Sequence, residues 1–157
     1  MLSFRQIASS AIIGLSVLGS SSIELGQKAF AAPAPPLTAL RVTGVYSDMG
    51  SVSGNGGWEY PIPMTSSIST QYSHYGNVIG VYVCETGYGQ NSIAKFNGNP
   101  MKLDRSDPQP DSSGTITGYC RLWEYDNSFN GGTFTYQASS INAPFRTLSL
   151  SFYVRAQ

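Results

Sequence analysis

The stretch TITGYCRLWEY, residues 115–125, is the clearest β-strand in the chain, because its side chains alternate between two distinct sets. Residues 77–85, NVIGVYVCE, are apolar at both parities, which is typical of a central strand buried on both faces. Residues 145–155, FRTLSLSFYVR, alternate again and close the domain. No segment shows convincing helical spacing, so these three stretches predict an all-β fold.

Shorter segments complete the predicted set of strands. We expect them at residues 37–46, 58–60, 92–96 and 133–139. Pro61 and Pro63 follow residues 58–60 and confine that strand to a sheet edge. We expect residues 92–96 to return as the hairpin partner of residues 77–85. Six or seven strands at fairly regular spacing favour an antiparallel sandwich or barrel-like fold.

Two segments lack strand patterns. Residues 64–75 form a connection rich in Ser and Thr. Residues 97–114 contain Asn-Gly, Asn-Pro, Asp-Pro and Ser-Gly dipeptides, which predict a long loop. Three aspartates between residues 104 and 111 suggest calcium, but their spacing is not that of an EF-hand, and Lys102 and Arg105 oppose a cation. We expect these aspartates to cap their own turns, and no metal is predicted.

The N-terminus predicts export from the cell. Residues 1–31 resemble a secretory signal peptide, with Arg5 ahead of an apolar stretch at residues 7–18. Ala29-Phe30-Ala31 places small residues at both positions that a signal peptidase recognises, so cleavage is expected after Ala31. An earlier cut near residues 20–22 is the alternative. The apolar stretch is too short for a membrane span, which predicts a secreted, extracellular protein.

Composition indicates one domain with little charge. Charged residues make up 11% of the 157 residues, against about a quarter in typical proteins. The formal net charge is zero, so no basic surface is available to collect phosphates, and no nucleic acid partner is expected. After the signal peptide, we expect a proline-rich arm at residues 32–36 and a single all-β domain at residues 37–157, with no membrane span in the mature chain.

The two cysteines, Cys84 and Cys120, predict one disulfide. Export would place them in an oxidising compartment, where an even number of cysteines in a small domain favours a bridge. The weaker alternatives are a reactive nucleophile and a metal pair, and the latter is disfavoured because structural zinc prefers about four nitrogen or sulfur ligands and the chain has one histidine. With two cysteines, the pairing is unique.

Strand parity then gives a candidate binding surface. If the disulfide is buried, the face of residues 115–125 that holds Cys120 points to the core, and the opposite face forms a surface stripe. That stripe consists of Tyr119, Arg121, Trp123 and Tyr125. Aromatic faces can stack a sugar ring or a peptide, and Trp58 near the predicted loops is a further candidate. The alternative is that the strand is central and a second sheet covers the aromatic face.

Residues able to catalyse hydrolysis are few. His74 is the single histidine, and no Gly-x-Ser-x-Gly nucleophile motif occurs. Glu59, Glu85 and Glu124 lie at predicted strand ends, and glycoside hydrolysis requires two carboxyls about 5–10 Å apart across a cleft. The simpler interpretation is a hydrogen-bonded histidine and glutamates at the surface or in salt bridges. No catalytic residue and no cofactor are therefore predicted.

Four segments carry a resemblance to a known family: APAPPLTALRVTGVYS, GGWE, CETGYGQNSIAKFNG and ITGYCRLWEY. Together they resemble the YolA-like family of small secreted bacterial proteins of unknown function, over about residues 33–155. The resemblance implies export, a compact β-rich domain and a bacterial source. It implies no activity and no site residues, and the two cysteines are a possible departure from the wider family.

Three functions remain open from the sequence. The first is a secreted binding module that recognises a glycan, a cell-surface component or another protein through aromatic residues. The second is a small secreted hydrolase that uses paired carboxylates, or His74 with a serine. The third is an extracellular toxin or inhibitor. We rank the binding module first.

Overall fold

The computed structural model describes residues 33–50, 56–60, 62 and 68–157, so the predicted signal peptide lies outside the described residues. The described part contains strands and no helix. The strands are β1 (Ala39–Gly50), β2 (Gly57–Glu59), β3 (Ser69–Thr86), β4 (Gly89–Phe96), β5 (Asn99–Pro100), β6 (Lys102–Pro110), β7 (Ile116–Tyr125), β8 (Phe129–Asn130), β9 (Gly132–Ser140) and β10 (Thr147–Arg155). Because β2, β5 and β8 have two or three residues each, seven longer strands carry the fold.

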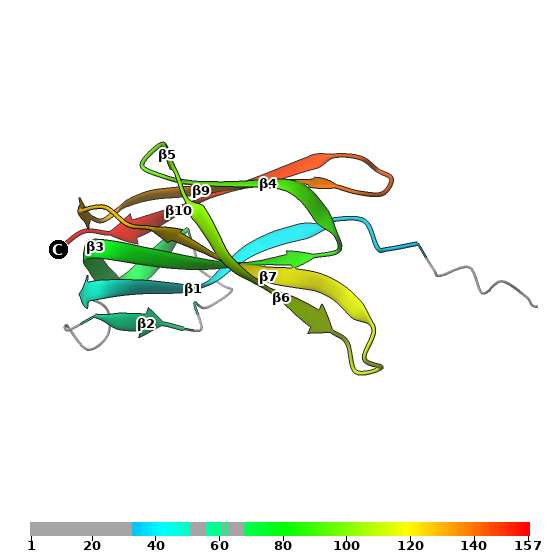
Figure 1. The fold of residues 1–157 in the computed structure, drawn as a ribbon, viewed down its shortest axis with the longest axis horizontal. Helices are drawn as coiled ribbons and strands as arrows, with labels where there is room; N and C mark the ends of the chain where they lie inside the picture. Colours follow the sequence, from blue (N-terminus) through cyan, green and yellow to red (C-terminus); the bar gives the residue numbers. More distant parts are fainter. Residues whose placement is uncertain (1–32, 51–55, 61, 63–67) are drawn as a thin grey trace, which may run out of the picture. The chain divides into compact units, whose positions relative to one another are not determined.

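The strands form one open sheet that folds over at β3 into two layers (Figure 1). The first layer has the order β2-β1-β3-β7-β6, and the second has the order β10-β9-β4-β5. β3 takes part in both, because residues 69–73 pair in parallel with β10 and residues 74–86 pair with β1. The other pairings between these strands are antiparallel, which confirms the all-β, antiparallel prediction.

The hydrophobic core lies between the two layers. Along β3, Val81 and Val83 point inward, and the alternating Phe134 and Tyr136 of β9 come from the other layer. Trp123 of β7 contacts Tyr136 across the core, with ring centroids 5.9 Å apart. Burial of each such side chain contributes about 1.5–3 kcal/mol, so this interior provides most of the stability of the fold.

The prediction of a loop at residues 97–114 is wrong. β5 and β6 occupy most of this segment, and β6 pairs along its length with β7. Turns do occur near both ends, where Gly98 and Gly114 have positive φ. Pro108 and Pro110 are compatible with a strand here because β6 is an edge strand, and a proline at an edge can leave its missing N–H on the unpaired side.

Two further expectations about strands are also wrong. Residues 92–96 belong to β4, which pairs with β9 and β5 in the second layer and not with β3. Gly87, with φ of +88°, lies where the chain leaves β3 for the other layer. Residues 69–75, expected in an irregular connection, are the beginning of β3. The part of that connection at residues 64–67 lies outside the described residues.

The predicted disulfide is present between Cys84 of β3 and Cys120 of β7. The two residues lie directly opposite each other in the antiparallel ladder. Their side chains are on the face of the first layer that points away from the second layer, because the neighbouring residues Val83 and Arg121 share the opposite, inner face. The disulfide therefore ties two central strands together from the outside of the sandwich.

Candidate functional site

The predicted aromatic stripe on β7 is not a surface. Trp123 is 7% exposed and belongs to the core, and Tyr125 packs against that core with its ring 5.5 Å from the ring of Phe96. Tyr119 and Arg121 share this inner face. The expectation of a surface stripe is thus wrong, and the alternative of a covering second sheet is confirmed. A surface stripe is expected only if the disulfide faces the core, whereas the disulfide lies on the outer face, where the Gln109 side chain contacts both sulfur atoms.

Arg121 instead takes part in a buried polar cluster between the layers. It forms an ion pair with Glu85, whose carboxylate also accepts hydrogen bonds from Tyr136 Oη at 2.5 Å and Ser92 Oγ at 3.2 Å. Burial, together with the hydrogen bond to Glu85, raises the pKa of Tyr136 to about 12. Gly89 passes close to this carboxylate, since a Cβ there would lie 2.7 Å from Glu85 Oε2. The cluster joins the two layers through a compensated charge pair.

His74 lies in a second buried polar cluster that has the composition of a hydrolase triad. Its Nδ1 is 2.7 Å from Ser47 Oγ and its Nε2 is 3.1 Å from Glu59 Oε2. Burial lowers the pKa of His74, and this effect outweighs the influence of Glu59. Nε2–H of His74 donates to the Glu59 carboxylate, while Ser47 Oγ donates to the carbonyl oxygen of Met49 at 2.5 Å and also lies within hydrogen-bond distance of Nδ1. Ser47 and His74 are 0% exposed, so the cluster offers a substrate no access and instead joins β1, β2 and β3.

The paired-carboxylate arrangement expected for a glycosidase is not formed by Glu85 and Glu124. Glu85 points into the interior with Arg121, whereas Glu124 lies on the outer face, opposite Gly80 and Lys102 in the ladder. The two carboxyls therefore face opposite sides of one sheet and share no cleft. Among the described residues, no group of three or more His, Cys, Asp or Glu is placed to hold a metal ion.

An exposed aromatic surface does exist, on the outer face of the first layer. Trp58 of β2, Tyr60, Tyr82 of β3 and Arg105 of β6 line a hollow of about 270 Å³, which we name the aromatic patch. Trp58 and Tyr60 are 43% and 63% exposed. The Trp58 ring is 6.5 Å from the Tyr82 ring in an edge-on arrangement, and Tyr46 supports Trp58 from β1 at 5.6 Å. Of the five residues predicted to bind a ligand, Trp58 alone lies in this patch.

Gly44 explains why the patch rings lie close against the sheet. A Cβ at Gly44 would be 2.9 Å from Cδ2 of Tyr60 and 3.3 Å from the Trp58 ring, so any larger side chain would displace both rings. The register of β1 against β3 shifts between Val42 and Gly44, which marks a β-bulge directly below the patch. Bulges increase strand twist and redirect side chains, and they are frequent next to functional sites.

Polar groups border the aromatic patch on the β6 side. Tyr82 Oη donates a hydrogen bond of 2.6 Å to Asp107 Oδ2, and Arg105 Nε donates to the same oxygen at 3.0 Å. The Arg105 guanidinium also lies 5.8 Å from the centre of the Tyr82 ring. Burial and the hydrogen bond to Asp107 raise the pKa of Tyr82 to about 12, so its hydroxyl is protonated and donates at neutral pH.

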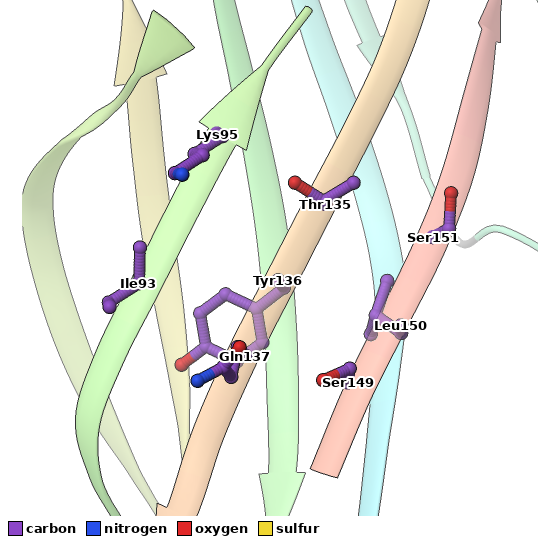
Figure 2. Close-up of a pocket in the computed structure, with 8 residues that line it drawn as sticks. All are labelled: Ile93, Lys95, Thr135, Tyr136, Gln137, Ser149, Leu150 and Ser151. Atoms are coloured by element: carbon purple, nitrogen blue, oxygen red, sulfur yellow. The ribbon is translucent and has the colours of Figure 1, made fainter. Parts of the chain in front are cut away.

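A second hollow, of about 460 Å³, lies on the outer face of the second layer (Figure 2). Figure 2 shows Ile93 and Lys95 on one strand, Thr135 and Gln137 on the next, and two serines on the third. The one aromatic residue at this hollow, Tyr136, is 1% exposed and belongs to the core. This surface offers hydroxyl groups, an amide and an ammonium group, without an exposed ring on which a ligand could stack.

The structure defines a two-layered all-β protein with exposed aromatic residues on the outer face of one layer. The family model described as "Domain of unknown function (DUF4879)" matches residues 32–154, and the chain belongs to this family. The matched segment begins at the same residue as the compact unit formed by residues 32–157. No curated protein and no solved structure matches the chain. In the described part of the chain, no helix has the length and apolar character needed to cross a membrane.

Proposed function

We propose that this protein is a secreted binding protein that docks carbohydrate on the aromatic patch. The observation that carries the proposal is the placement of Trp58 and Tyr60, both well exposed, beside Tyr82 on the outer face of the first layer. Exposed aromatic rings grouped in a hollow lose hydration favourably when they stack against an apolar surface. Trp and Tyr are also the residues that most often dominate binding energy at recognition sites.

The size and charge of the patch favour a sugar over a larger apolar ligand. Its hollow of about 270 Å³ is below the roughly 300–1,000 Å³ of pockets that enclose a drug-sized molecule. Such a shallow site accommodates one ring of a longer chain, with the neighbouring units in solvent. The one cation of the patch, Arg105, is already compensated by Asp107, which favours an uncharged ligand.

Several features support an extracellular location. The chain begins with a predicted signal peptide, and the Cys84–Cys120 disulfide is of the kind that persists in oxidising compartments. The resemblance to the YolA-like secreted proteins points in the same direction. A protein outside the cell meets cell-wall glycans and exogenous polysaccharides, which are the partners that this proposal assigns to it.

Pull-down with polysaccharides tests the proposal directly. The purified mature protein is mixed with insoluble cellulose, xylan, starch, chitin, peptidoglycan and curdlan, and the bound fraction is measured. Trp58→Ala should reduce binding to the retained polysaccharide at least 10-fold, because it removes the largest exposed ring of the patch. Tyr153→Ala is the matched control, since Tyr153 is similarly exposed, at 49%, but lies on β10 in the other layer.

Binding that is equal for wild type and Trp58→Ala, or no binding to any polysaccharide, would make the proposal wrong. Growth-inhibition assays with the same purified protein then address the alternative of an extracellular toxin or inhibitor.

A further inference from the structure

Asp107 presents a carboxylate at the border of the aromatic patch. Its Oδ2 accepts hydrogen bonds from Tyr82 Oη and Arg105 Nε. Among the described residues, Oδ1 accepts no hydrogen bond from another side chain or from the backbone. The Asp107 side chain is 44% exposed, so Oδ1 is an acceptor open to a ligand on the patch.

Arg105 presents donors beside that acceptor. A guanidinium group has five N–H donors, and the Nε–H of Arg105 is used by Asp107. The terminal nitrogens remain for a ligand, on a side chain that is 58% exposed and whose guanidinium carbon lies 5.8 Å from the centre of the Tyr82 ring. An acceptor and a donor group therefore lie next to each other at the edge of the hollow.

Adjacent hydroxyl groups match this arrangement better than a charged ligand does. A hydroxyl both donates and accepts, so of two neighbouring hydroxyls one can donate to Asp107 Oδ1 while the other accepts from Arg105. A ligand carboxylate near Arg105 would also lie near Asp107, and a ligand ammonium near Asp107 would lie near Arg105. Either ligand charge would be attracted by one of these two side chains and repelled by the other, so an ionic group adds little binding free energy here.

We infer that the aromatic patch recognises an uncharged pyranose ring by its vicinal diol, with Asp107 as acceptor, Arg105 as donor and the ring's C–H face on Trp58. This inference rests on the proposed function and specifies its ligand. It assigns to β6, an edge strand, the role of selecting the sugar, while β2 and β3 supply the stacking surface. Internal units of 1,4-linked glucans and xylans carry such a diol at the second and third ring carbons, whereas internal units of 1,3-linked glucans do not.

Chemical removal of the diol tests this inference without changing the protein. Periodate cleaves the carbon–carbon bond between vicinal hydroxyls and thereby also opens the pyranose ring, and subsequent borohydride reduction converts the resulting aldehydes to alcohols. Curdlan, whose rings are closed but lack the diol, separates loss of the diol from loss of the stacking face. Cellulose, xylan or starch treated in this way should lose at least 10-fold in affinity for the wild-type protein. The same polysaccharide treated with borohydride alone should bind normally, and curdlan should bind weakly with or without periodate.

Substitutions on β6 test the same inference from the protein side. Asp107→Ala should weaken binding to the untreated polysaccharide about 10- to 100-fold, the range expected for hydrogen bonds to a charged group. Asp107→Asn, which retains an acceptor oxygen, should lose less affinity. It should also bind polygalacturonate more strongly than wild type does, because the repelling charge is removed. Ser106→Ala is the matched control, since Ser106 is on the same strand and pairs with the inward-facing Arg121.

The outcomes separate the two proposals. If Trp58→Ala abolishes binding while periodate treatment and Asp107→Ala leave it unchanged, the diol inference is wrong and carbohydrate docking on the patch stands. If the retained polysaccharide binds wild type equally well before and after periodate treatment, or if the polysaccharides retained are ones whose internal units lack a vicinal diol, such as curdlan or chitin, the inference is equally wrong. If no polysaccharide binds at all, both proposals are wrong. Thermal unfolding of each variant shows whether a loss of binding reflects loss of the fold.

Discussion

At the scale of single residues, His74 links the stability of the fold to pH. Its imidazole is buried between Ser47 and Glu59, and burial lowers its pKa below the usual value of 6.5. A histidine with a lowered pKa in the folded state takes up its proton first in the unfolded chain. Acidification therefore favours unfolding, and the stability contributed by neutral His74 is present above pH 6.5.

We predict that the free energy of unfolding falls as the pH drops from 7 to 5, by at most about 1.4 kcal/mol per pH unit. His74 is the single histidine, but burial and nearby carboxylates raise the pKa of Glu124, so the effect of His74 is taken as the difference between wild type and His74→Gln in urea unfolding at each pH. His74→Gln should be less stable at pH 7 and should show a flatter dependence. A wild-type stability that is constant or rises on acidification would contradict this account.

The pair of Glu85 and Arg121 is the second determinant at this scale. Their side chains are 0% and 14% exposed, so each charge depends on the other for compensation. We predict that Glu85→Ala lowers the free energy of unfolding by about 3–5 kcal/mol, because it leaves a guanidinium group buried without its partner. Urea denaturation measures the loss.

The double variant Glu85→Leu with Arg121→Met provides the control for that prediction. It replaces both charges by apolar groups, and it should recover most of the lost stability. A loss below about 1 kcal/mol in the single variant would mean that water or another group compensates Arg121.

At the scale of elements, β3 is the strand on which the fold depends. Its 18 residues pair with β1, β7 and β10, and it carries Val81 and Val83 inward and Tyr82 and Cys84 outward. The apolar run at residues 77–85 correctly predicted a central strand. The same run does not identify Tyr82 as a candidate site residue, because a strand that is apolar on both faces gives no sign of which face a ligand can reach.

The disulfide fixes β3 to β7 at the level of Cys84 and Cys120. We predict that replacing both cysteines by alanine lowers the free energy of unfolding by about 3–4 kcal/mol, from the chain entropy regained when a link across 36 residues is removed. Urea denaturation of the double variant and of reduced wild-type protein should give similar values. A change below about 1 kcal/mol in both would show that the bridge is not a main source of stability.

β6 shows where the sequence signal was misleading. The turn dipeptides at the two ends of residues 97–114 correctly predict turns. The segment between them is nevertheless a nine-residue edge strand that contains two prolines. The turn dipeptides predict a loop around Arg105 and Asp107 and give no sign that both residues lie beside Tyr82. Such a strand is held by its pairing with β7, and its own side chains, nearly all exposed, leave no alternating apolar pattern.

At the scale of the whole molecule, charge and aromatic character are distributed in an unusual way. The interior between the layers holds the Glu85–Arg121 pair, whereas the outer face of the first layer exposes Trp58 and Tyr60. Sequence alone predicts the all-β class, six of the seven long strands and the disulfide, and it names Trp58 as a candidate, but it misses β6. It could not decide which face of β7 is covered, because Trp123 and Tyr125 suit a core as well as a surface.

The two tryptophans make one measurement especially direct. Trp58 is 43% exposed on the patch and Trp123 is 7% exposed in the core, so acrylamide should quench an accessible and an inaccessible component of the fluorescence. The account predicts that a saturating polysaccharide from the pull-down, in soluble form, removes the accessible component by covering Trp58. Quenching that stays unchanged while the polysaccharide is bound would contradict the central claim that the aromatic patch is the binding site.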